Sequence, residues 1–219
     1  MLRLLFTKQG NAVWISHLDL MRVFQRAFKR AGLPLTHTQG FNPRPSVSIA
    51  LPLSVGMESN CELLDFELDG CNVSCEDIKN MLNDNLITGV SVLDVYENGK
   101  KIRELAYLRS AISLEYDNGV PDNAIGMIEG LFEAKEVWVE KKSKNGTQDQ
   151  NIIPMIQKLT VSIPDGNHIM LDVVACCQNP SLNPTQLAAA VVRYLPEYAP
   201  DFSRCCRIEV FDHNMEIFR

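Results

Sequence analysis

Residues 62–97 read ELLDFELDGCNVSCEDIKNMLNDNLITGVSVLDVYE, and their pattern is the clearest indication of the fold class. Within residues 62–68, Leu64, Phe66 and Leu68 alternate with Asp65 and Glu67, which is typical of a half-buried strand. The segment 74–86 opens with a Ser-x-x-Asp capping signature and then has helical character. Residues 89–97 again have strand character. The stretch therefore predicts a strand, a helix and a strand in succession.

The residues before this stretch complete one recognisable plan. Residues 3–8 and 12–16 flank a Gln-Gly-Asn turn, which predicts a β-hairpin. Residues 16–34 predict a helix, because a second Ser-x-x-Asp signature opens the segment and a glycine and a proline end it. Residues 46–53 predict another strand. The order is β-α-β-β-α-β, the ferredoxin-like plan, with an N-terminal β-hairpin in place of its first strand.

The rest of the chain repeats this order of elements. The predicted strands and helices are residues 110–117, 121–134, 136–142, 158–177 around an Asp-Gly turn, 183–195 and 205–213. We therefore predict an α+β protein of two packed ferredoxin-like halves, with domains at residues 1–105 and 106–219. Trp14 and Trp138 fall in segments of strand character, so we expect both in the core.

Composition favours a cytoplasmic globular protein. The 219 residues are 46% hydrophobic, which is enough for a sizeable core. No run of about 18 apolar residues is present, so no membrane partner is expected. The opening MLRLLF lacks the long apolar region of a secretory signal. The seven cysteines form no Cys-x-x-Cys pair, which is typical of free thiols in a reducing compartment.

Motifs for catalysis, metals and cofactors are missing from the sequence. Cys71 and Cys75 have a three-residue gap, but no third cysteine follows to complete a cluster-binding run. Phosphate-binding glycine loops, nucleophile elbows and zinc-binding helices are also missing. The four histidines have no metal-ligand spacing. We expect no metal and no cofactor, and a binding or accessory role rather than enzymatic activity.

Charge is distributed unevenly along the chain. Residues 1–50 hold seven basic and one acidic side chain, a net charge of +6, whereas the remainder holds 14 basic and 26 acidic ones, a net charge of −12. This split indicates a localised anion-binding surface, or else a solvated face whose cations pair with the acidic body. Lys141, Lys142 and Lys144 stand before an Asn-Gly pair, where they either extend that surface or form a plain turn.

Four cations share one face of the helix expected at residues 16–34. At 100° per residue they fall within a sector of about 100° opposite the apolar stripe. Their mutual repulsion is easier to understand if an anion binds there. The four cations are Arg22, Arg26, Lys29 and Arg30.

The segment after this helix is unusually stiff. Gly40 allows a backbone turn closed to other residues, while Pro43 and Pro45 fix φ and favour extended neighbours. We expect a rigid ledge that presents a stacking ring, a bidirectional hydrogen-bonding amide and a cation, a set that suits single-stranded RNA. These residues are Phe41, Asn42 and Arg44. The alternative is a crossover that tucks Phe41 into the core.

A set of motifs along residues 16–56 is typical of a known family. The motifs are Ser16-His17-Leu18-Asp19, Arg22, Arg26, Arg30, Gly40-Phe41-Asn42-Pro43, Pro45, Leu53 and Gly56. With them, the first 70 residues resemble the radical-SAM-linked protein family. This bacterial domain of unknown function occurs alone or fused behind a cobalamin-binding and radical S-adenosylmethionine module. The resemblance implies a radical SAM enzyme as partner, but it supplies no activity.

Three functions agree with these patterns. The first is a non-catalytic accessory protein that binds RNA, tRNA in particular, for a radical SAM enzyme. The second is a docking module whose basic face meets an acidic protein. The third is a metal-independent ribonuclease resembling CRISPR repeat-processing enzymes, with His17 and His37 as candidate catalytic residues. A helix between these histidines would hold them roughly 25 Å apart unless the chain doubled back.

Overall fold

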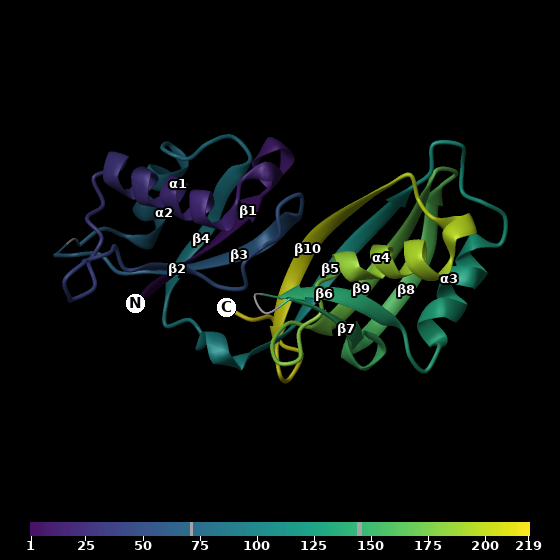
Figure 1. The fold of residues 1–219 in the computed structure, drawn as a ribbon. Coiled ribbons are helices and arrows are strands. Elements are labelled where there is room, and N and C mark those ends of the chain that lie inside the picture. Colours follow the sequence, from purple (N-terminus) through teal and green to yellow (C-terminus); the bar gives the residue numbers. More distant parts are fainter. Residues whose placement is uncertain (71, 144–145) are drawn as a thin grey trace. The chain divides into compact units, whose positions relative to one another are not determined.

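The computed structural model describes residues 1–70, 72–143 and 146–219. Over these residues the chain is a mixed α+β protein with four α-helices and mostly antiparallel strand pairing, which confirms the predicted class (Figure 1). Contacts group the chain into two compact units, Met1–Glu104 with Arg219, and Leu105–Phe218. Among the described helices, none is long and apolar enough to cross a membrane.

The first unit is a four-stranded antiparallel arrangement with two helices. Its strands follow the order β4-β1-β3-β2, and each neighbouring pair is antiparallel. Along the chain its elements are β1 (Leu2–Lys8), η1 (Gly10–Trp14), α1 (His17–Arg30), β2 (Val47–Ile49), β3 (Glu58–Phe66), α2 (Cys75–Asn83), β4 (Val90–Glu97) and η2 (Ile102–Glu104).

One face of this sheet packs against both helices. Alternation along β1 and β3 places Phe6 and Phe66 in a buried cluster with side chains of α1 and α2. The rings of Phe6 and Phe24 meet edge to face at 4.7 Å, and those of Phe28 and Phe66 lie 4.9 Å apart. The apolar stripe of α1 therefore fixes which helix face remains exposed.

Both predicted capping signatures are confirmed. The Ser16 hydroxyl accepts a hydrogen bond from the Asp19 amide at 3.2 Å, and Ser74 does the same for the Asp77 amide at 3.1 Å. Each serine hydroxyl also donates to the carboxylate of the same aspartate. These contacts set the first turns of α1 and α2.

The predicted N-terminal β-hairpin is wrong. Residues Gly10–Trp14 form the 3-10 helix η1 rather than a second strand. The reason is tertiary: β1 already pairs with β3 on one side and with β4 on the other, so it has no free edge for a hairpin partner.

In the second unit the main strands follow the order β10-β5-β9-β8 with antiparallel neighbours, and β6 and β7 form a separate hairpin. The helices α3 and α4 lie near β8 and β6 respectively (Figure 1). The predicted Asp-Gly turn joins β8 to β9. The elements of the second unit are β5 (Leu105–Glu115), α3 (Ala124–Glu133), β6 (Trp138–Ser143), β7 (Gly146–Asn151), η3 (Ile153–Met155), β8 (Ile156–Asp165), β9 (His168–Cys176), α4 (Thr185–Tyr194), η4 (Pro196–Tyr198) and β10 (Phe202–Asp212).

Both tryptophans lie outside the core, contrary to expectation. Trp14 ends η1 with 66% of its surface exposed, since its segment is no strand and the alternation argument does not apply to it. Trp138 does lie in a strand but is 42% exposed, and its indole N–H donates to the Glu136 carboxylate at 2.9 Å. Trp138 belongs to the small β6–β7 hairpin rather than to the main sheet.

Candidate nucleic-acid interface

The cations of α1 divide into two groups. Arg22 pairs with Asp19 one turn earlier at 2.7 Å, with both side chains more than half exposed. Arg30 donates from its guanidinium to the Asn85 carbonyl, just beyond the end of α2. Arg26 and Lys29 are exposed, and within the described residues their side chains make no hydrogen bond or ion pair. The two central cations are therefore available to an external anion.

Asp19 is the one acidic residue of α1. Its carboxylate accepts hydrogen bonds from Ser16 and then from Arg22, and these contacts lower its pKa below the ordinary value. It therefore remains ionised near neutral pH and neutralises part of the charge of Arg22. The carbonyl that Arg30 meets is neutral, so Arg26, Lys29 and Arg30 carry positive charge that no ion pair among the described residues offsets.

Residues 36–46 form an irregular hairpin after α1. The Thr38 amide donates to the Arg44 carbonyl at 2.8 Å, and the Arg44 amide donates to the Thr38 hydroxyl at 3.0 Å. Closer to its base, the Ser46 amide donates to the Thr36 carbonyl at 2.8 Å. The Thr36 amide donates in turn to the carbonyl of Glu67, immediately after β3. The stiff segment is thus anchored to the sheet and closed on itself.

Phe41 projects from the tip of this hairpin. Its relative exposure is 107%, so the alternative in which Phe41 enters the core is wrong. Gly40 precedes it with φ of 141°, a conformation that favours glycine. Asn42 and Arg44 are exposed as well. The physical reason is that the closing hydrogen bonds leave the five residues between Thr38 and Arg44 outside the packed layer.

A cavity of about 500 Å³ lies between α1 and the base of this hairpin. Its apolar lining comes from the end of α1 and the following chain: Phe28, Leu33, Pro34, Leu35 and Pro45. Its polar lining consists of Arg22, Gln25, Arg26, Lys29 and His37. A volume of this size falls within the usual range for small-molecule sites.

The structure thus brings together some of the candidate site residues and separates others. Three cations of α1 and His37 line one cavity. His17 is the first residue of α1 and does not line it. Because α1 has 14 residues, its two ends are about 20 Å apart, and a shared role in RNA cleavage gains no support from this geometry. Phe41 and Asn42 stand on the tip and Arg44 closes it, and none of the three lines the cavity.

Sequence reasoning missed the cavity because no motif encodes it. Its walls come from one helix face and from a loop whose path depends on the hydrogen bonds at Thr36 and Thr38. The nearest signal was the cluster of prolines after the helix. Among the described residues, no group of three or more histidine, cysteine or acidic side chains is arranged to hold a metal ion.

Three residues of the sequence patterns lie outside the described residues. They are Cys71 of the Cys71–Cys75 gap, and Lys144 and Asn145 of the lysine-rich turn. Lys141 from the same turn donates to the Ser181 carbonyl at 3.3 Å, so it is held within the second unit.

A family model described as an uncharacterized protein conserved in bacteria (DUF2344) matches residues 1–184. The chain belongs to this family. The DUF2344 match includes α1, the hairpin tip and every residue that lines the cavity. No curated protein matches the chain.

One solved structure resembles this DUF2344 member in fold, and a second aligns with a lower score. A chain of a Cbf5-Nop10-Gar1 complex has a TM-score of 0.54 at 9% identity, over 95% of this chain and 48% of that chain. This chain therefore spans about half the length of that relative. An unknown protein from Galdieria sulphuraria matches at 8% identity over 94% of this chain and 96% of that chain, with a TM-score of 0.27. At such identities the likeness to the first concerns the fold alone.

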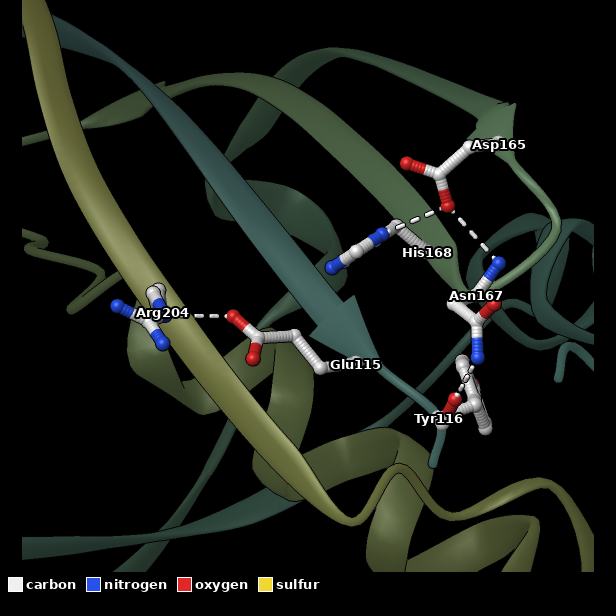
Figure 2. Close-up of polar contacts among 6 residues, drawn as sticks. All are labelled: Glu115, Tyr116, Asp165, Asn167, His168 and Arg204. Atoms are coloured by element: carbon white, nitrogen blue, oxygen red, sulfur yellow. Dashed lines mark hydrogen bonds and ion pairs between the residues drawn. The ribbon is translucent and has the colours of Figure 1, made fainter. Parts of the chain in front are cut away.

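A second polar cluster lies in the second unit, and sequence reasoning missed it (Figure 2). The imidazole Nδ1 of His168 is 2.7 Å from the Asp165 carboxylate, and the Arg204 guanidinium donates to Glu115 at 2.6 Å. Glu115 and His168 face each other across β5 and β9. Asp165 also accepts from the Asn167 amide at 2.8 Å. The contacts of Asp165 close the β8–β9 turn, and the i, i+3 spacing of Asp165 and His168 was the available signal.

Proposed function

We propose that this protein binds single-stranded RNA through α1 and the hairpin tip, and that it serves as a non-catalytic accessory to a radical SAM enzyme. The observation that carries the proposal is the complete exposure of Phe41 on a tip closed by Thr38 and Arg44, beside a helix with unpaired cations. A tRNA is the RNA class that we expect.

Charge supports the RNA-binding part of the proposal. The side chains of Arg26 and Lys29 make no hydrogen bond or ion pair within the described residues, although the protein as a whole carries a net charge of −6. A polyanion gains from such a local basic face because counterions are released when phosphates bind. An acidic body around the face also disfavours non-specific adsorption along the rest of the surface.

The exposed ring supports a single-stranded ligand rather than a duplex. Leaving a phenylalanine fully in water is unfavourable, by roughly 1.5–3 kcal/mol relative to burial. An unstacked base covers such a ring without sequence selectivity. Arg44 and Asn42 stand beside it with donors for a phosphate and a base edge.

We also propose that each unit follows the ferredoxin-like plan. In the first unit the strands β1 to β4 lie in the order 4-1-3-2. In the second, β5, β8, β9 and β10 play the corresponding parts, and the β6–β7 hairpin is inserted after α3. This agreement of strand order supports a duplication. A crystal structure with a different strand order in either unit would contradict it.

The partner enzyme in the proposal comes from the resemblance of residues 1–70 to the radical-SAM-linked family. The accessory would hold the RNA while the partner supplies the reaction. Consistent with that division of work, we expect the purified chain to bind neither an iron–sulfur cluster nor S-adenosylmethionine.

The test combines binding with identification of the partner. Fluorescence anisotropy with a labelled single-stranded RNA of about ten nucleotides should show saturable binding that weakens with salt. Crosslinking in cells should recover RNA attached to α1 or the tip. If the same face crosslinks to an acidic protein and recovers no RNA above background, the docking function replaces the proposed one.

A further inference from the structure

The cavity beside α1 has an apolar floor and a cationic wall. Phe28 and Leu33 are at most 2% exposed and form the floor of the cavity. Arg26 and Lys29 line the same cavity from the exposed face of α1. A ligand that fits both sides needs an apolar body and an anionic end.

No acidic side chain lines this cavity among the described residues. The remaining polar groups are the Gln25 amide and the His37 imidazole. An amide both donates and accepts hydrogen bonds, so Gln25 suits the edge of a nucleobase. An imidazole ring offers a flat surface and a hydrogen-bonding nitrogen, which also suits a base.

We propose that this cavity holds one unstacked nucleotide, with its base against Leu33 and Leu35 and its phosphate at Arg26 and Lys29. The inference rests on the proposed RNA-binding function and names the ligand of one part of that site. Its volume of about 500 Å³ lies in the range of cavities that hold small ligands. The base would leave the strand, as bases do when proteins read single-stranded RNA.

The position of the cavity fits a strand that runs along the hairpin. His37 and Pro45 pair across the hairpin base and line the cavity, while Phe41 stands at the tip of the same hairpin. Two adjacent bases would then meet different supports, one stacked on Phe41 and one inside the cavity. This arrangement predicts that the cavity and the tip contribute separately to affinity.

The experiment first uses free nucleotides and the unaltered protein. Nuclear magnetic resonance follows the imidazole signals of His37, assigned with a His37→Asn variant, during titration with the four nucleoside 5′-monophosphates. Ribose 5-phosphate, inorganic phosphate and octanoate are the comparison ligands. The nucleotides should shift the His37 signals saturably, with smaller shifts from the comparison ligands. Equal shifts from ribose 5-phosphate or octanoate would overturn the assignment to a nucleotide.

A second experiment uses a larger side chain at residue 25 to fill the cavity. Gln25→Trp should weaken binding of the labelled RNA by about 5- to 150-fold, the range for loss of one stacked base, whereas Gln25→Ala should have a smaller effect. Circular dichroism and the dispersion of amide signals establish that both variants are folded. Unchanged RNA affinity in a folded Gln25→Trp variant would contradict the proposal.

Together, the nucleotide titration and the Gln25→Trp measurement distinguish failure of the nucleotide cavity from failure of the RNA-binding function. RNA binding without a His37 shift by nucleotides, and without an effect of Gln25→Trp, refutes the nucleotide cavity and leaves the RNA-binding function standing. A His37 shift by nucleotides without any RNA binding supports the cavity as a free-nucleotide site and refutes the proposed function. If the protein shows neither RNA binding nor a shift of His37 by nucleotides, both the nucleotide cavity and the RNA-binding function are refuted.

Discussion

Two hydrogen bonds join Thr38 and Arg44 across a five-residue tip. The Thr38 amide donates to the Arg44 carbonyl at 2.8 Å, and the Arg44 amide donates to the Thr38 hydroxyl at 3.0 Å. The second bond depends on a side chain, so it can be removed without altering the residues at the tip. A substitution at Thr38 therefore tests whether the closed tip matters for binding, without altering Phe41.

Thr38→Val should loosen the tip while preserving side-chain shape. The variant removes the acceptor of the Arg44 amide, a bond worth about 0.5–1.5 kcal/mol. We expect faster hydrogen exchange at Arg44 and weaker RNA binding, with little change in the melting temperature. Thr36→Val, in the same hairpin but with no role in this hydrogen bond, is the control. Unchanged exchange at Arg44 would show that the tip is held in another way.

Phe41→Ala should weaken RNA binding by roughly 1–3 kcal/mol, because one base would lose its stacking partner. Stability should change by less than about 0.5 kcal/mol, since the ring is fully exposed. Binding isotherms and thermal unfolding measure the two effects. Phe202→Ala, which removes another exposed ring in the second unit, should leave RNA binding unchanged. Equal losses in both variants would mean that the ring at the tip has no special role.

The double substitution Arg22→Ala with Arg26→Ala should weaken RNA binding and flatten its salt dependence. Each lost phosphate contact on a single strand reduces the log–log slope by about 0.7. The control is Lys101→Ala with Arg103→Ala, which removes the same charge from η2 and the residue just before it in the first unit. Arg30→Ala should change the slope less, because that guanidinium already serves the Asn85 carbonyl. A control variant with the same slope change would refute a localised interface.

Stability should fall at alkaline pH because of a buried thiol. Burial raises the pKa of Cys205 from 9.0 to about 12, with a smaller contribution from Cys206. The neutral thiol therefore stabilises the fold fully below pH 9, and this stabilisation is lost as pH rises toward 12.

The change expected from this thiol is on the order of 4 kcal/mol at most. Urea unfolding between pH 8 and 11 should show a shallower decline in the Cys205→Ala variant than in the unaltered protein. Cys176→Ala, which removes a half-buried thiol, is the control. An identical decline in all three proteins would exclude Cys205 as a cause.

Local patterns in the sequence determined the helices and much of the core. Ser16 and Ser74 cap α1 and α2 as their spacing predicts, because a capping box depends on only four consecutive residues. The apolar stripe of α1 is likewise a local property, so its exposed face was predicted to carry the four cations. The Asp-Gly turn between β8 and β9 also follows from its own two residues.

The contacts of those cations depend on packing between distant segments. Arg30 meets the Asn85 carbonyl from 55 residues away, whereas Arg26, four residues earlier, makes no hydrogen bond or ion pair among the described residues. The 3-10 conformation of Gly10–Trp14 follows from pairing of β1 with β3 and β4, which no hairpin pattern reveals. Periodicity reports whether a residue faces the core, but contacts between distant segments depend on how strands and loops pack in three dimensions. The cavity beside α1 and the exposure of Phe41 arise from such contacts.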